Sequence, residues 1–252
     1  MVDLKNVVQR YAESLAALDL NTQPERANQR TGEFYKPGIK SLREPQVVKA
    51  VDEWWGSHYP ADFCDPNIPR LGVRYPTMET PTKCDHVFTT DTDDSYPEWA
   101  IEWKNVVLIG DNGKRNDYTT GKILSPYLKD RSLLHDVARL REYPLARRHA
   151  VVGYGFNYSL ETCEEARSRF PEHSETIANI EEVCRQNGGS LSMRPLLDFA
   201  EAILYIRSFV PGPRSQEDFL AWAHPAGGHG MVFGWEIRRP EMESDFDPRH
   251  PW

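Results

Sequence analysis

The stretch Glu98-Trp-Ala-Ile-Glu102-Trp-Lys104 alternates large apolar residues with small or charged ones. Successive side chains of a β-strand point to opposite faces, so the tryptophans and the isoleucine share one face while Glu102 and Lys104 share the other. Asp85 lies seventeen residues before Glu102. If Asp85 ends or kinks a neighbouring strand, its carboxylate meets that of Glu102. Two carboxylates and a lysine are what a hard divalent cation and an attacking water need beside a phosphate.

Composition sets the limits of what the chain can be. Its 252 residues, of which 39% are hydrophobic, suffice for one large domain or two small ones. The net charge of −8 argues against a general nucleic-acid coat protein but is compatible with a local basic groove. The four cysteines form no CxxC pair, which predicts free thiols in a reducing cytoplasm. The sequence shows neither an export signal nor an apolar run of the roughly 20 residues that span a bilayer, so we expect no membrane partner.

Hydrophobic periodicity predicts alternating helices and strands. Helices are expected over residues 4–18, 47–55, 125–142, 161–187 and 195–209. Strands are expected over residues 85–90, 98–109, 150–156 and 231–238. Residues 21–40 and 56–82 are rich in proline, glycine and polar side chains and are expected to be irregular. This order predicts an α/β fold, with a mixed central β-sheet flanked by helices.

Asp85, then Glu102-Trp103-Lys104 on the next strand, then a helix and a buried strand, resembles the PD-(D/E)xK restriction-endonuclease-like superfamily over residues 41–158. The sequence departs from the family motif in one place, because Cys84 stands where the motif has proline. The resemblance implies N-terminal helices plus a restriction-endonuclease-like catalytic core in residues 1–158. Residues 159–252 would then be the helical and strand C-terminal part of the same compact unit, serving recognition or dimerisation.

The resemblance also implies the site residues. Asp85, Glu102 and Lys104 would be catalytic, and Asp85 and Glu102 would hold Mg²⁺, for which Mn²⁺ would substitute. The backbone carbonyl of Trp103 would be a further metal ligand. A glutamate of the first core helix often joins such a site, a role that Glu44 or Glu53 would fill.

Simpler interpretations compete with these assignments. Three acids in the connection before the stretch rival Asp85 as the first carboxylate: Asp91, Asp93 and Asp94. Glu102 and Lys104 would also make an ion pair across the pleat of a solvated strand face, a contact that contributes little stability.

Three further side chains have structural interpretations. Glu44 would complete a helix-capping box with Ser41. His86 is expected on the opposite face from the preceding aspartate, as a core or surface histidine. His135 and Asp136 suggest a catalytic pair, but adjacent helical positions diverge by about 100°, so we expect them at the surface.

Basic residues are concentrated in one block. Residues 104–148 contain ten Lys or Arg against five Asp or Glu, whereas residues 157–252 contain nine Arg against sixteen acids. A nuclease would hold the phosphate backbone beside such a block. The predicted nucleic-acid contacts are Lys114, Arg115, Lys122, Lys129 and Arg131.

Together these features predict a cytoplasmic, Mg²⁺-dependent endonuclease that hydrolyses phosphodiester bonds of double-stranded DNA. The resemblance points to a restriction or defence nuclease of the type II kind, with a homodimer as one arrangement. The main alternative is a non-catalytic nucleic-acid-binding or scaffold protein that keeps the fold. A nuclease directed to RNA or to repair is the third possibility.

Overall fold

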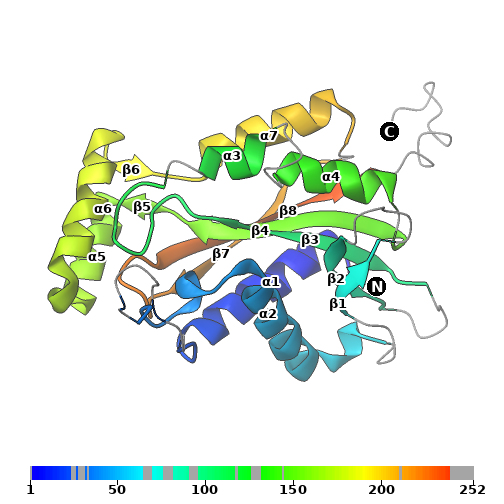
Figure 1. The fold of residues 1–252 in the computed structure, drawn as a ribbon, viewed down its shortest axis with the longest axis horizontal. Helices are drawn as coiled ribbons and strands as arrows, with labels where there is room; N and C mark the ends of the chain where they lie inside the picture. Colours follow the sequence, from blue (N-terminus) through cyan, green and yellow to red (C-terminus); the bar gives the residue numbers. More distant parts are fainter. Residues whose placement is uncertain are drawn as a thin grey trace.

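A computed structural model describes residues 2–23, 27, 32, 34–64, 70–75, 82–90, 96–116, 119–125, 132–143, 145–209 and 212–238. One mixed, six-stranded sheet runs through the molecule with helices on both faces (Figure 1), so the predicted α/β class is confirmed. In spatial order its strands are β1 (Leu71–Arg74), β2 (Lys83–Phe88), β3 (Trp99–Val106), β4 (Arg148–Phe156), β8 (Gly228–Ile237) and β7 (Ser215–Ala221). β3 and β4 are parallel, and the other neighbouring pairs are antiparallel.

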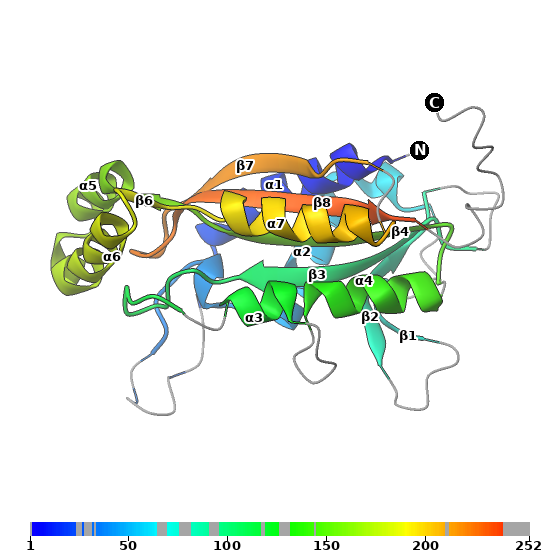
Figure 2. The same cartoon turned by 90° about the horizontal axis from the view of Figure 1, so that it is seen from above.

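The helices form a layer on each face of the sheet. One face is covered by α1 (Leu4–Asp19) and α2 (Glu44–His58), and the other by α3 (Thr119–Leu124), α4 (Leu133–Glu142) and α7 (Arg194–Ile206). At one end of the sheet, α5 (Leu160–Arg169) and α6 (Ser174–Gln186) pack together (Figure 2), beside a small sheet of β5 (Tyr158–Ser159) and β6 (Ser190–Leu191). Three short 3₁₀ turns complete the described elements: η1 (Ile39–Ser41), η2 (Pro60–Asp62) and η4 (Pro171–His173).

β3 shows the alternation that the sequence predicts. Trp99, Ile101 and Trp103 pack into the core beneath α1 and α2, whereas Ala100 and Val106 belong to the separate core beneath α4 and α7. β3 lies between β2 and β4, and helices cover both faces of the sheet, so all but one of its residues are buried. The charged residues of this strand therefore face a helix and not solvent.

Some expected boundaries are wrong. Of the helix expected over residues 125–142, the structure shows α4 from Leu133 onward, while residues 126–131 lie outside the described part. α3 precedes this range and was not expected. Ser132 caps α4, since its hydroxyl accepts a hydrogen bond from the His135 amide at 3.3 Å. The capping box with Ser41 is also wrong, because α2 begins at Glu44 itself.

Two strands of the six-stranded sheet were not expected, and neither were the two short strands β5 and β6. β1 has four residues and lies inside the proline-rich segment that we expected to be irregular. β7 is the last strand of the sheet, and its consecutive polar residues 216–218 are exposed, so they lack the period of two of a half-buried strand.

Candidate active site

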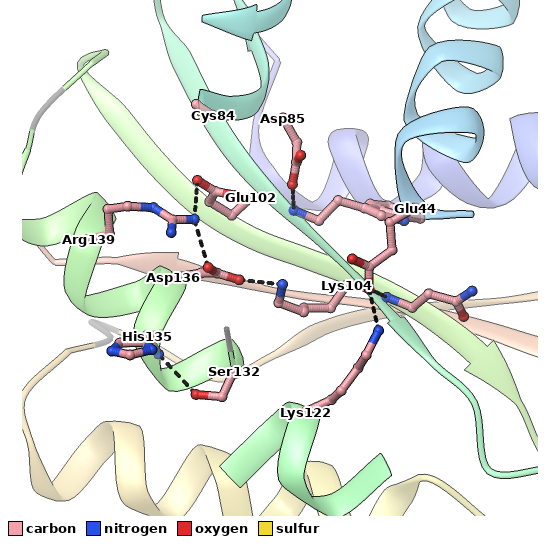
Figure 3. A network of polar contacts seen from close by, with 12 residues as sticks. Glu44, Cys84, Asp85, Glu102, Lys104, Lys122, Ser132, His135, Asp136 and Arg139 are labelled. Atoms are coloured by element: carbon pink, nitrogen blue, oxygen red, sulfur yellow. Dashed lines mark hydrogen bonds and ion pairs between the residues drawn. The ribbon is translucent and has the colours of Figure 1, made fainter. Parts of the chain in front are cut away.

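The strands β2 and β3 separate at Asp85. In the register of these two strands, Phe88 faces Trp99 and His86 faces Ile101, and the pairing ends at this last pair. Beyond this point Oδ2 of Asp85 accepts a hydrogen bond from the Trp103 amide at 2.8 Å (Figure 3). A side-chain carboxylate thus takes the place of a strand partner at the edge of β3. β2 itself continues to Lys83 beside β1, so Asp85 ends the pairing of β2 with β3 and not the strand.

Glu44 accepts a hydrogen bond from the next free amide along the same edge of β3. As the first residue of α2, it accepts a hydrogen bond from the Asn105 amide at 3.0 Å, and the Lys122 ammonium lies 3.5 Å from the same oxygen. Glu53 instead is exposed and pairs with Lys49 at 3.7 Å. Of the two glutamates that the sequence leaves open, only Glu44 reaches β3.

Strand geometry places the Trp103 carbonyl on this edge. The N–H and C=O groups of one strand residue point to the same side. Since the Trp103 amide meets Asp85, its carbonyl lies along the same edge of β3. Two carboxylates and a carbonyl oxygen therefore line the edge of β3 that β2 leaves uncovered.

On the face of β3 toward α4, Glu102 and Lys104 are buried, being 2% and 7% exposed. They do not pair with each other, so the predicted pair across the pleat is wrong. The Lys104 ammonium lies 2.6 Å from Oδ2 of Asp136, and the Arg139 Nη2 atom lies 2.7 Å from Oε1 of Glu102 (Figure 3). The same Arg139 nitrogen lies 2.7 Å from Oδ1 of Asp136, which closes a network of three buried charges and the partly buried Arg139.

Two of these partners were missed from the sequence. Asp136 was expected at the surface together with His135, but it is 1% exposed, so that interpretation is wrong. Asp136 and Arg139 are three residues apart on α4 and therefore lie on the same face of the helix. Tyr75 was missed as well, and its hydroxyl donates a hydrogen bond to Oε1 of Glu102 at 2.6 Å.

Burial and neighbouring charges perturb the titration of this network. Burial raises the pKa of Glu102 well above its ordinary value, and the nearby Asp136 and Asp85 raise it further, while Arg139 opposes them. Burial acts to lower the pKa of the Lys104 ammonium, but Asp136, Glu44 and Glu102 together outweigh it, so this pKa lies above its ordinary value. Lys104 is therefore a cation at neutral pH.

His86 is a core residue, as the sequence predicts. Its ring nitrogens lie 2.8 Å from the Tyr11 hydroxyl and 3.0 Å from Oδ1 of Asp52. The ring packs among aromatic side chains beneath α1 and α2. It takes no part in the carboxylate cluster.

The predicted nucleic-acid contacts fall into three groups. Lys122 lies beside Glu44, next to the cluster. Lys114 and Arg115 are exposed in the loop that follows β3. Lys129 and Arg131, like the rival acids Asp91, Asp93 and Asp94, lie outside the described residues.

The donor atoms can be tested against a hard divalent cation. Within the described ranges, no three His, Cys, Asp or Glu side chains are grouped as a metal site. Asp85, Glu102 and the Trp103 carbonyl supply only two side chains and one backbone oxygen, a donor set of the kind that Mg²⁺ binds with waters completing its shell. Burial is the main cause of the raised pKa of Glu102, and repulsion from Asp136 and Asp85 adds to it, a repulsion that a bound cation would relieve. These residues fit the ion.

None of the helices in the described part of the chain combines the length and the apolar character that a membrane crossing requires. Comparison with protein-family models, with curated proteins and with solved structures found no match. Fold and site geometry are therefore what bears on function.

Proposed function

We propose that this protein is a metal-dependent endonuclease that hydrolyses phosphodiester bonds of DNA. One observation carries the proposal: Asp85 binds the Trp103 amide between Glu102 and Lys104, at the point where β2 leaves β3. This contact brings the first acid of the sequence motif to the strand that carries its second acid and its lysine. The resemblance to restriction-endonuclease-like proteins makes a restriction or defence role the leading biological context.

The residues divide the work as follows. Asp85 and Glu102, with the Trp103 carbonyl, would hold Mg²⁺ or Mn²⁺. When bound, the ion supplies Lewis-acid polarisation of the scissile phosphate and lowers the pKa of a coordinated water. Glu44 anchors α2 to the edge of β3 and carries Lys122 beside the site.

Lys104 acts as a fixed positive charge. Asp136 and the other nearby acids raise its pKa, so it is protonated at neutral pH in the metal-free protein. An ammonium held by a buried carboxylate is preorganised to orient water and to stabilise negative charge that develops on the phosphate. Lys122, with Lys114 and Arg115 in the loop after β3, would contact the phosphate backbone, and residues 159–252 would serve recognition or a dimer contact.

The alternative is a scaffold or nucleic-acid-binding protein that does not cleave. The ion pairs Arg139–Glu102 and Lys104–Asp136 favour it, because they satisfy the buried charges without any metal. The two functions assign different roles to Asp85 at the edge of β3. In the scaffold, Asp85 only accepts the Trp103 hydrogen bond; in the nuclease, its negative charge is required.

The variant Asp85→Asn distinguishes the nuclease from the scaffold. The asparagine carbonyl can still accept the Trp103 hydrogen bond, so the fold should be kept, while the charge is lost. We expect plasmid cleavage with Mg²⁺ or Mn²⁺ to fall by about 10²–10³, comparable to the loss of one preorganised electrostatic group. The melting temperature should stay the same or rise, because Asp85 no longer repels Glu102.

Glu53→Gln is the matched control, since it removes one negative charge from α2 away from the site. It should cleave as the wild type does. If wild-type protein cuts no nucleic acid with any divalent metal, and Asp85→Asn changes neither metal binding nor stability, the scaffold function is supported instead.

A further inference from the structure

The Arg139 guanidinium joins the two acids beneath α4. A single nitrogen, Nη2, lies 2.7 Å from both Oε1 of Glu102 and Oδ1 of Asp136. The Tyr75 hydroxyl donates to that same Glu102 oxygen. Arg139 therefore places a positive charge against the carboxylate that the proposed function assigns to the metal.

This pairing does not use the geometry that arginine favours. A guanidinium pairs most strongly with a carboxylate through two parallel N–H groups. Here one nitrogen is shared between two acids, and the buried Nε–H of Arg139 finds no hydrogen-bond partner within the described part of the chain. A buried donor without a partner is unfavourable. The Arg139–Glu102 contact is thus weaker than a two-bond pair.

Charge explains why Arg139 is held there. Glu102, Asp136 and Asp85 interact with one another and with two cations, Lys104 and Arg139. Lys104 is engaged by Asp136 at 2.6 Å, which leaves Arg139 as the cation on Glu102. Without Arg139, three carboxylates would face one ammonium. Such a cluster either takes up protons or binds another cation.

We propose that Arg139 is the internal counterion of the metal site, occupying the cation's place beside Glu102 and giving up this contact when a divalent ion binds. The inference rests on the proposed function. It means that Arg139 lowers the affinity of the site for Mg²⁺ and Mn²⁺, and that metal binding moves one side chain of α4. Tyr75 can keep its hydrogen bond to Glu102, because the hydroxyl carries no charge.

The test is Mn²⁺ binding to the full chain, by calorimetry and by the Mn²⁺-induced rise in melting temperature, without nucleic acid. Arg139→Gln should bind Mn²⁺ about tenfold more tightly than the wild type, a factor that corresponds to 1.4 kcal/mol. Arg139→Lys keeps the charge and should bind like the wild type. Tyr75→Phe removes a donor to the same oxygen without removing charge, and it should not tighten binding.

Two further variants exclude other causes. Arg141→Ala removes a positive charge from the same helix, where the guanidinium contacts the Ser208 carbonyl at 2.9 Å, and should leave the Mn²⁺ affinity unchanged. Combining Arg139→Gln with Glu102→Gln should abolish the gain. Melting without metal shows that each variant is folded.

The outcomes are distinct. If the wild type binds Mn²⁺ through Glu102 but folded Arg139→Gln binds it no more tightly, this inference is overturned and the proposed function stands. An equal gain in Arg141→Ala would overturn it as well, because the effect would be long-range charge. If neither the wild type nor Arg139→Gln binds Mn²⁺, both the inference and the proposed function fail.

Discussion

Asp136→Asn should strongly destabilise the protein, although asparagine has nearly the same shape. Asp136 is 1% exposed and neutralises Lys104 at 2.6 Å and Arg139 at 2.7 Å. Removing one partner of a buried ion pair typically lowers the unfolding free energy by about 3–5 kcal/mol. At roughly 2–4 °C per kcal/mol for a chain of this size, the melting temperature should fall by about 6–20 °C.

The assay is urea and thermal unfolding at pH 7, with Glu53→Gln as the control. The side chains of Lys49 and Glu53 are 67% and 65% exposed. Loss of this surface ion pair should therefore change the unfolding free energy by less than about 0.5 kcal/mol. If Asp136→Asn is no more destabilising than Glu53→Gln, the ion pairs of Asp136 with Lys104 and Arg139 do not stabilise the fold, and the reasoning is refuted.

The pH dependence identifies Lys104 as the affected group. In the wild type the pKa of Lys104 is raised, so its stabilisation is present below the ordinary lysine pKa and is lost as pH rises through the folded value. In Asp136→Asn, burial then dominates and lowers that pKa, so the charged lysine destabilises the variant until it deprotonates. The stability difference between the two proteins should therefore shrink as the pH rises toward the ordinary lysine pKa of about 10.4. A difference that stays constant from pH 7 to pH 10.5 would refute the role of Lys104.

Two further predictions concern charges outside this network. Replacing Lys114 and Arg115 together by alanine should flatten the dependence of log K for DNA on log salt by roughly 1–2 units, and an unchanged slope would place the DNA groove elsewhere. Burial lowers the pKa of Lys40 to about 8, while its ammonium donates to the Ile109 carbonyl at 2.7 Å. Because the unfolded chain then binds more protons between pH 8 and 10.5, wild-type stability should rise relative to Lys40→Met by about 3 kcal/mol across this range. Urea unfolding at both pH values measures this change, and a constant difference would contradict the buried charge of Lys40.

The sequence predicts those parts of the fold where burial follows a simple period. Trp99, Ile101 and Trp103 alternate with smaller or charged residues, and this alternation alone identifies the two faces of β3. β1 and β7 escape such reasoning for different reasons. β1 is too short to show a period, and β7 pairs on one side only, so exposure breaks its pattern.

The site was predictable only as far as one strand and its neighbour. Asp85, Glu102 and Lys104 follow from strand alternation and spacing, whereas Asp136 and Arg139 come from a distant helix that no spacing rule links to β3. A signal was nevertheless present. Asp136 falls on the same stripe of α4 as Leu133, Val137 and Leu140, and an acid on an apolar stripe must find a buried partner.

The cost of this network bears on what the protein does. Buried ion pairs are seldom the most stable solution, since apolar residues of similar volume often stabilise a core as well or better. Charged side chains nevertheless occupy the space between β3 and α4: Glu102, Lys104, Asp136 and Arg139. The buried Nε–H of Arg139 has no hydrogen-bond partner among the residues that the structure describes. In a scaffold these ion pairs satisfy one another but perform no further function. An active site does, because charges fixed in a low-dielectric interior act on a phosphate without reorganising first. The two functions therefore differ in the effect of an apolar replacement. Changing Lys104 and Asp136 together to Met and Leu should leave a scaffold as stable as before and fully able to bind DNA, whereas in a nuclease it should keep the fold and abolish cleavage.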